Sequence, residues 1–212
     1  MNQIDIFNEH VKEYEAWYDN YSEVYQSEIL ALQDQLLELP QNIRGIEVGV
    51  GTGLFSKPLD IKEGVESSKE MAKRAVKRGI EIMKGTAERL PYAAMQFDFV
   101  LFVTVCFIKN VKKAFEEAYR VLKPEGSVII GFLESDGQIA KRYAEERHRS
   151  DFYHKAQFYS VNRIEKLIRK TGFKKPTYNQ TLFGELEDIK EVQIPREGFG
   201  QGSFVTIRAI KK

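Results

Sequence analysis

A glycine-rich turn directly follows an apolar segment at residues 43–55, which read IRGIEVGVGTGLF. The β-branched side chains of the first half favour a strand. Gly49, Gly51 and Gly53 let the backbone turn sharply and carry no Cβ atom that would keep a ligand at a distance. A strand, a glycine turn and the start of a helix form the nucleotide-binding corner of a doubly wound α/β sheet. The sequence therefore predicts an α/β fold with a ligand site here; the alternative is a purely structural turn.

Two features of this turn discriminate between ligands. The dinucleotide fingerprint requires a third glycine three residues after the second, where this chain has Leu54. Glu47, two residues before the first glycine, would repel a pyrophosphate and attract an ammonium group. S-adenosylmethionine carries an ammonium group, a sulfonium and no phosphate. The turn resembles the first motif of the class I methyltransferases, an acidic residue and an apolar residue followed by G-x-G-x-G.

Composition and charge limit which classes of protein and partner remain possible for this chain. The 212 residues fit one domain, and a net charge of +1 gives no overall field that would attract nucleic acid or an anionic membrane. The single cysteine, Cys106, excludes an internal disulfide framework and a zinc cluster, so no metal is expected. The N-terminus lacks the basic and apolar regions of a signal peptide, and no apolar run is long enough to span a bilayer. We therefore expect a cytoplasmic protein.

Residues 5–39 are predicted to form two helices that end before Pro40. Aromatic side chains recur along them at spacings of three and four, which indicates one continuous stripe. The stripe either packs into the core or covers a cofactor, because aromatic faces attract a sulfonium cation. Tyr14, Trp17 and Tyr18 are the candidates for such a cover.

The second strand, Ile61 to Val65, ends in Glu66. Glu66 lies 19 positions after Glu47 (66 − 47), close to the offset of about 20 at which an acidic residue binds a ribose. We predict that Glu66 accepts the ribose hydroxyl protons and that Ser67 lies beside it. Ser67 or Ser68 is expected to cap the next helix.

Two further segments carry the family resemblance. Residues 85–92, GTAERLPY, resemble the G-D-A-E-x-L-P-F loop of the type 11, UbiE-like methyltransferases, and residues 120–126, RVLKPEG, resemble their R-V-L-K-P-G-G turn. With the glycine turn and Glu66, four motifs lie in the family's order between residues 43 and 134, so the chain is identified as a member. The resemblance implies that Thr86, where the family usually has Asp, and Ala87 contact the adenine.

The resemblance also implies an organisation for the whole chain, a single methyltransferase domain over 1–212. A helical lid (1–40) precedes a cofactor-binding core (41–134). An acceptor-pocket segment (135–160), then a helix and antiparallel strands (161–212), complete it. The expected fold is a Rossmann-like, doubly wound, mostly parallel sheet of seven strands in the order 3-2-1-4-5-7-6, with N-terminal helices.

The fourth strand, Phe97 to Val103, is followed by Thr104, which should face the transferring methyl because sites lie beyond the carboxyl ends of parallel strands. Cys106 suggests covalent chemistry, but a small buried thiol is the simpler interpretation. No catalytic pair stands out. His148 and His154 are the candidates for a base, and a surface position is the alternative for each.

The sequence thus predicts methyl transfer by in-line displacement from S-adenosylmethionine, with S-adenosylhomocysteine as product, to a nitrogen, oxygen or carbon atom of a small molecule. No nucleic-acid or membrane partner is expected, and the oligomeric state is not predicted. The alternatives are an NAD-dependent oxidoreductase, a non-catalytic protein that binds S-adenosylmethionine, and a nucleic-acid methyltransferase. Leu54 and Glu47 disfavour the oxidoreductase. Only turnover separates the non-catalytic binding protein from an enzyme, because the same binding residues serve both, and affinity for RNA that falls steeply with salt would support a nucleic-acid methyltransferase.

Overall fold

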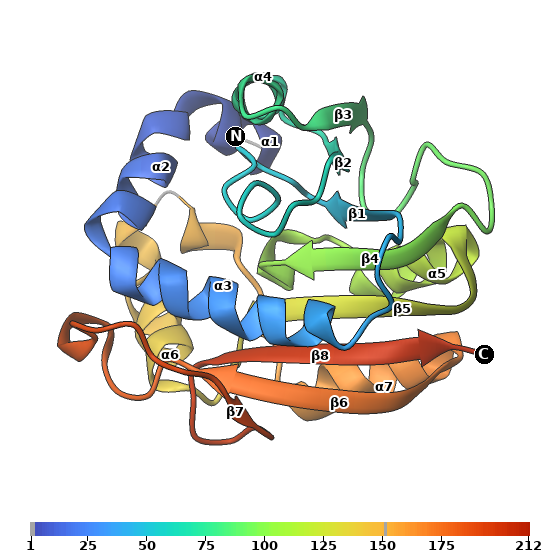
Figure 1. The fold of residues 1–212 in the computed structure, drawn as a ribbon. Coiled ribbons are helices and arrows are strands. Elements are labelled where there is room, and N and C mark those ends of the chain that lie inside the picture. The colour runs from blue at the N-terminus through green and yellow to red at the C-terminus, as the bar shows by residue number, and fades with distance from the viewer. Residues whose placement is uncertain (1–2, 151) are drawn as a thin grey trace.

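The computed structural model describes residues 3–150 and 152–212 as helices packed around one central sheet (Figure 1). Residues 1, 2 and 151, which belong to the predicted lid and acceptor-pocket segments, lie outside this description. The strands are β1 (Gly45–Val48), β2 (Glu63–Glu66), β3 (Glu81–Lys84), β4 (Phe97–Val103), β5 (Leu122–Leu133), β6 (Phe173–Thr181), β7 (Arg196–Glu197) and β8 (Phe204–Lys211).

The strands are arranged in the order β3-β2-β1-β4-β5-β8-β6-β7. The first five pair in parallel, and β8 then pairs antiparallel with β5 and with β6. If β8 is counted as the seventh strand, the predicted order 3-2-1-4-5-7-6 is confirmed. The two-residue β7, which was not predicted, extends the edge beyond β6.

The helices are α1 (Gln3–Glu9), α2 (Val11–Asn20), α3 (Ser22–Leu37), α4 (Lys69–Lys77), α5 (Val111–Val121), α6 (Gln138–Glu145) and α7 (Val161–Thr171), with short 3-10 turns η1 (Val105–Phe107), η2 (Arg147–Arg149), η3 (Tyr153–Lys155) and η4 (Leu186–Asp188). α5 packs against α7, and α3 packs against β5, β6 and β8 (Figure 1). None of the helices in the described residues is long and apolar enough to cross a membrane.

The N-terminal region differs from the prediction because it forms three helices rather than two. The chain leaves helical geometry at His10 (φ −113°, ψ 32°) and at Tyr21 (φ −120°, ψ 51°). No glycine or proline stands at either break, so the sequence carries no signal for them. The end of α3 at Leu37, before Pro40, is as predicted.

The helix expected after the glycine turn is also absent from the described residues. Residues 51–60 form successive turns, in which Lys57 N donates to Gly53 O (3.1 Å) and Leu59 N donates to Phe55 O (3.3 Å). Pro58 cannot donate a backbone hydrogen bond, which prevents a continuous helix. The glycine turn therefore leads into a compact irregular connection.

Helix caps follow the sequence closely elsewhere. The Ser68 hydroxyl accepts from Met71 N at the start of α4, and the Ser160 hydroxyl accepts from Arg163 N at the start of α7. Gly172 ends α7 with a φ of 113°. Glu125, where the family has glycine, also takes a positive φ of 61°.

Candidate functional site

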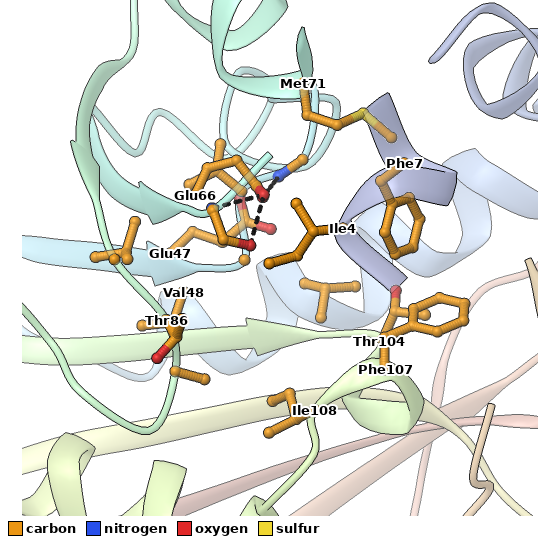
Figure 2. A pocket seen from close by; sticks show the side chains of 18 of the residues that line it. Ile4, Phe7, Glu47, Val48, Glu66, Met71, Thr86, Thr104, Phe107 and Ile108 are labelled. Carbon is orange, nitrogen blue, oxygen red and sulfur yellow. Dashed lines mark hydrogen bonds between the residues drawn. The ribbon is translucent and has the colours of Figure 1, made fainter. Parts of the chain in front are cut away.

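A cavity, here called the glycine-turn cavity, opens at the carboxyl ends of β1, β2 and β4 (Figure 2). Nine of the eleven residues predicted to bind the cofactor line it: Tyr14, Glu47, Gly49, Gly51, Glu66, Ser67, Thr86, Ala87 and Thr104. Figure 2 shows Ile4 and Phe7 of α1 across the cavity from Glu47 and Glu66. The structure therefore brings together residues that are up to 90 positions apart (104 − 14).

Glu47 lies in β1 just before the glycine turn and is only 1% exposed. The Ser56 hydroxyl donates to its carboxylate. Burial raises the pKa of Glu47 to about 8, although the Ser56 hydrogen bond acts in the opposite direction. No cation compensates this carboxyl in the described part of the chain, so an arriving ammonium group would favour its ionised form.

Glu66 ends β2 and ties that strand to the glycine turn. Its Oε1 accepts from the backbone N–H groups of Ser67 (2.8 Å) and Ser68 (2.7 Å), and its Oε2 accepts from Gly51 N (2.8 Å). The Ser67 hydroxyl adds a longer contact to Oε1 (3.4 Å), so all of the carboxylate's roughly four acceptor positions are engaged. A ligand diol that donates both protons must therefore share or lengthen one of the existing hydrogen bonds.

The three glycines of the turn have different surroundings. Gly49 (φ 80°) has open space where a Cβ would stand, and a Cβ on Gly51 (φ 58°) would lie 3.5 Å from the Tyr14 hydroxyl. Gly53 does not line the cavity, because a Cβ there would lie 2.5 Å from Ile80 Cδ1 and 3.2 Å from Ala75 Cα. Gly53 thus allows the turn to pack on α4, instead of approaching a ligand as predicted.

The loop after β3 forms another wall of the cavity. Thr86 and Ala87 line it, and Arg89 N donates to Thr86 O (3.1 Å), which fixes the loop. Glu88 accepts from Asn110 N (3.1 Å), a contact that joins the loop to the start of α5.

The N-terminal helices are fastened to α4 beside the cavity. Asn8 Oδ1 accepts from the Ser68 hydroxyl (2.8 Å) and from Glu70 N (3.2 Å). Glu15 of α2 forms ion pairs with Arg74 of α4 (3.2 Å) and with Arg78, the residue that caps the end of α4 (2.7 Å). These contacts hold α1 and α2 over the carboxyl ends of the strands.

A second cavity, here called the aromatic chamber, adjoins the first. Phe7, Tyr14, Thr104 and Phe107 line both. The chamber is otherwise lined by Glu13, Trp17, Tyr18, Tyr143, Glu146, Ser150, Phe152 and Tyr153, so eight of its twelve lining residues are aromatic. The rings contact one another, with centroids 4.3 Å apart for the stacked pair Tyr143–Tyr153 and 5.2 Å apart for Tyr14–Tyr18.

Thr104 stands at the junction of the two cavities. It has a left-handed backbone (φ 63°, ψ 53°), a conformation that is unfavourable for a threonine and is frequent at functional sites. The chain therefore turns sharply at the end of β4, where a transferring group would pass between the cavities.

Other predicted residues occupy different positions. Trp17 and Tyr18 line the aromatic chamber and not the glycine-turn cavity. His148 and His154 are exposed and line neither cavity, so the structure does not bring these candidate bases to the site. Burial raises the pKa of the Cys106 thiol, as expected for an unreactive buried cysteine.

Sequence reasoning missed the acidic and tyrosyl groups of the chamber, Glu13, Glu146, Tyr143 and Tyr153. It also missed Glu28 of α3, which is 6% exposed. Glu28 lies three positions after Tyr25 and four before Leu32, on the face of α3 that packs inward. Because its neighbours on this face of the helix are apolar or aromatic, the spacing indicated that Glu28 would be buried.

Comparison with known proteins agrees with this geometry. The family described as "Methyltransferase domain" matches residues 46–130. The crystal structure of a Thermotoga maritima protein, titled a SAM-dependent methyltransferase and possible histamine N-methyltransferase, is 41% identical and superposes with a TM-score of 0.94 over 100% of both chains.

Two curated relatives extend the comparison. An uncharacterized protein of Methanocaldococcus jannaschii is 43% identical over 98% of this chain and 100% of its own length. The ubiquinone/menaquinone biosynthesis C-methyltransferase UbiE of Rickettsia bellii is 32% identical over 65% of this chain and 56% of its own length.

Proposed function

This chain belongs to the type 11 family of class I S-adenosylmethionine-dependent methyltransferases, and we propose that it methylates a small molecule bound in the aromatic chamber. The cofactor supplies a methyl group that its sulfonium already activates. The work left to the protein is therefore to position the two reactants and to exclude water.

The residues of the glycine-turn cavity fit the parts of this cofactor. Glu47 pairs with the ammonium group of the amino-acid end, and the open space at Gly49 admits a close approach of the ligand to the backbone. Glu66 accepts hydrogen bonds from the ribose, while Thr86 and Ala87 face the adenine. Each assignment matches a lining residue with a complementary group of the cofactor.

The single observation that carries the proposal is the wall common to both cavities. Phe7, Tyr14, Thr104 and Phe107 contact both spaces, so a methyl group held at this junction faces an acceptor in the chamber. The aromatic faces of the wall also attract a sulfonium cation. A chamber lined mainly by aromatic rings suits a small molecule better than a polymer.

A nitrogen atom of an amine is the acceptor that we favour. The Thermotoga maritima relative is described as a possible histamine N-methyltransferase. Two carboxylates, Glu13 and Glu146, line the chamber of this chain, and they suit a positively charged amine. The oxidoreductase alternative has no comparable support.

The proposal is tested by calorimetric titration of wild type and Glu66→Ala with S-adenosylmethionine and, separately, with NAD. We expect only S-adenosylmethionine to bind and Glu66→Ala to weaken it about tenfold to a hundredfold, because a charge-assisted hydrogen bond is lost. Glu81→Ala, which removes an exposed carboxylate on the neighbouring β3, is the matched control and should bind normally. Binding of NAD alone would contradict the proposal.

A further inference from the structure

Aromatic rings form most of the wall that the two cavities share. Of the four residues that line both cavities, Phe7, Tyr14 and Phe107 are aromatic, and Thr104 is the fourth. The Phe7 ring lies edge to face with the Phe107 ring, with centroids 5.1 Å apart (Figure 2), and 6.2 Å from the Tyr14 ring. Among the described residues, no carboxylate lines both cavities. An acceptor atom at this junction therefore meets aromatic rings and hydroxyls rather than an anion.

Further rings of the chamber extend this wall in both directions. On one side, the Tyr14 ring contacts Tyr18 (centroids 5.2 Å apart), which contacts Trp17 (4.9 Å). On the other side, the Phe107 ring stacks on Tyr153 (5.8 Å). All five residues line the chamber. The chamber is therefore an aromatic cage, an arrangement that attracts organic cations through the negative faces of its rings.

The charged groups of the chamber are accessible to solvent. Glu13 and Glu146 supply its two carboxylates, and their side chains are 64% and 45% exposed, whereas Tyr18 is only 9% exposed. No lysine, arginine or histidine is among the described lining residues. The two carboxylates therefore draw a cation toward the chamber, but they leave few strong acceptors for N–H groups among the buried rings.

The number of N–H groups on a nitrogen decides how well it fits this cage. A primary ammonium carries three N–H groups, and each one that is buried without an acceptor costs free energy. The junction offers the hydroxyls of Tyr14 and Thr104, and the Tyr14 hydroxyl already shares a hydrogen bond with the Tyr18 hydroxyl (3.4 Å). A methyl group in place of an N–H removes a donor that needs a partner and adds apolar surface against the rings. The cage therefore favours a nitrogen that already carries methyl groups.

We propose that the acceptor is a tertiary amine whose dimethylamino group binds in the aromatic chamber, so that the product is a quaternary trimethylammonium compound. This inference rests on the proposed function and narrows its substrate class. The rings hold the nitrogen by its charge and its methyl groups, and the carboxylates at Glu13 and Glu146 add a longer-range attraction.

The transfer step balances without a protein base. A tertiary ammonium first releases its proton to solvent, because two cations would repel each other at the junction. The lone pair of the neutral nitrogen then forms the N–C bond, the C–S bond breaks, and its electron pair stays on sulfur as a neutral thioether. The positive charge passes to the nitrogen, which has no N–H left to lose. This step agrees with the positions of His148 and His154, which line neither cavity.

Binding is measured by fluorescence, because Trp17 is the single tryptophan of the chain and lines the chamber. The ligands share one phenyl group and are titrated at pH 7 with S-adenosylhomocysteine present. They are 2-phenylethylamine, its N,N-dimethyl and N,N,N-trimethyl derivatives, and the neutral 2-phenylethanol. We expect the trimethyl compound to bind about tenfold tighter than 2-phenylethylamine, with the dimethyl compound between them. Equal affinities, or tighter binding of the primary amine, would contradict the proposal.

The part played by the rings is tested at Phe152, which lines the chamber but not the glycine-turn cavity and contacts Phe7 (5.6 Å) and Tyr14 (6.1 Å). Phe152→Leu keeps an apolar side chain without a ring, so it should weaken the trimethyl compound about fivefold and leave 2-phenylethanol unchanged. Phe152→Tyr should bind as wild type. Phe158→Leu is the matched control, because Phe158 contacts Tyr153 (5.9 Å) without lining the chamber. An equal loss for 2-phenylethanol in Phe152→Leu would show that the ring supplies apolar contact alone.

Turnover with S-adenosylmethionine and each amine is followed by mass spectrometry. We expect kcat/KM for the N,N-dimethyl compound to exceed that for 2-phenylethylamine by about tenfold. The trimethyl product should inhibit competitively against the dimethyl substrate, because the cage binds both. A chain that methylates the primary amine but not the tertiary one would overturn the inference.

Titration of the same samples with S-adenosylmethionine separates the two proposals. Wild type that binds S-adenosylmethionine but none of the amines, or that shows no preference for the methylated ones, overturns the assignment of a tertiary amine and leaves methylation of a small molecule in place. Failure of wild type to bind S-adenosylmethionine overturns the proposed function itself. Thermal melting confirms that each variant is folded, and Phe152→Met serves if Phe152→Leu is not.

Discussion

Glu28, Glu47 and Glu66 are three buried carboxyl groups with different surroundings. Glu66 accepts from three backbone N–H groups and a serine hydroxyl, Glu47 from the hydroxyl and backbone of Ser56, and Glu28 from no group in the described residues. Glu47 and Glu28 therefore have a raised pKa of about 8 because burial dominates. At the scale of single residues, the pKa of each carboxyl depends on the balance between its burial and the hydrogen bonds that it accepts.

The raised pKa of Glu47 predicts that affinity for the cofactor depends on pH. Below pH 8 its carboxyl must release a proton before it can pair with an ammonium, so binding of S-adenosylmethionine should strengthen by up to about tenfold per pH unit between pH 6 and 8. Above pH 8 the gain should end, because an α-amino group loses its own proton at about 7.7–8.0.

The measurement is calorimetric titration at several pH values in buffers of different ionisation enthalpy, which also counts the protons released. Glu47→Gln should lose the pH dependence and the proton release, and Glu81→Gln should keep both. Equal slopes in wild type and Glu47→Gln would disprove the pairing of Glu47 with the ammonium group.

The positions of single residues were predictable where the backbone conformation requires a particular residue type. The glycine turn and the spacing from Glu47 to Glu66 indicated two carboxyls that do line one cavity. Gly53 packs against Ile80 and Ala75 instead of lining the cavity, and a glycine that admits a neighbouring helix looks the same in sequence as one that admits a ligand. His148 and His154 were chosen by residue type alone, which carries no information about where a side chain points.

At the scale of elements, α1 and α2 are held over the site by a small number of polar contacts with α4. The ion pairs of Glu15 with Arg74 and Arg78 join partly exposed cations to a mostly buried carboxylate. Such pairs contribute modestly to the stability of a whole domain. Their effect should therefore appear in local opening of these helices rather than in global unfolding.

Glu15→Gln is expected to raise amide hydrogen exchange in residues 3–20 and to speed dissociation of S-adenosylmethionine a few-fold, with little change in melting temperature. Lys73→Gln is the control, because it removes the exposed ion pair of Lys73 with Glu70 within α4 itself. Unchanged exchange in residues 3–20 of Glu15→Gln would show that these ion pairs do not fasten the helices.

Element boundaries were predictable where a cap, a proline or a glycine marks them. Two helices begin after a serine, Ser68 or Ser160. Two helices end before Pro40 or Gly172. These boundaries agree with the structure. The breaks at His10 and Tyr21 carry no such residue; the rings at these two positions contact Phe152 and Trp17, respectively. The spacing of the aromatic residues continues unchanged across both breaks, so it does not reveal them.

At the scale of the whole molecule, binding of the cofactor to the folded state should stabilise the chain. At 100 times its dissociation constant a ligand adds about 2.7 kcal/mol, which for a chain of this size raises the melting temperature by about 5–10 °C. We expect this shift with S-adenosylmethionine and with S-adenosylhomocysteine in thermal melts. NAD is the control ligand, and an equal shift with NAD would contradict the cofactor assignment.

The sheet order was predictable because four motifs lie in one order between residues 43 and 134, and each belongs to a fixed place in this fold. For the aromatic chamber, the sequence indicated the segments, a lid at 1–40 and an acceptor pocket at 135–160, but not the residues of the wall, which combines α1 and α2 with Tyr143, Glu146, Ser150, Phe152 and Tyr153. Only tertiary packing brings these segments together, and neither has a distinctive motif. The cofactor could thus be inferred from the sequence, whereas the lining of the proposed acceptor site required the structure.

Phe7 and Tyr14, which belong to the N-terminal helices, line both cavities. We therefore expect one movement of these helices to change access to both spaces. Donor and acceptor would then be bound before the helices close, and both products would leave when they open. The steady-state kinetics should accordingly be sequential through a ternary complex, with release of products limiting turnover once both substrates are saturating.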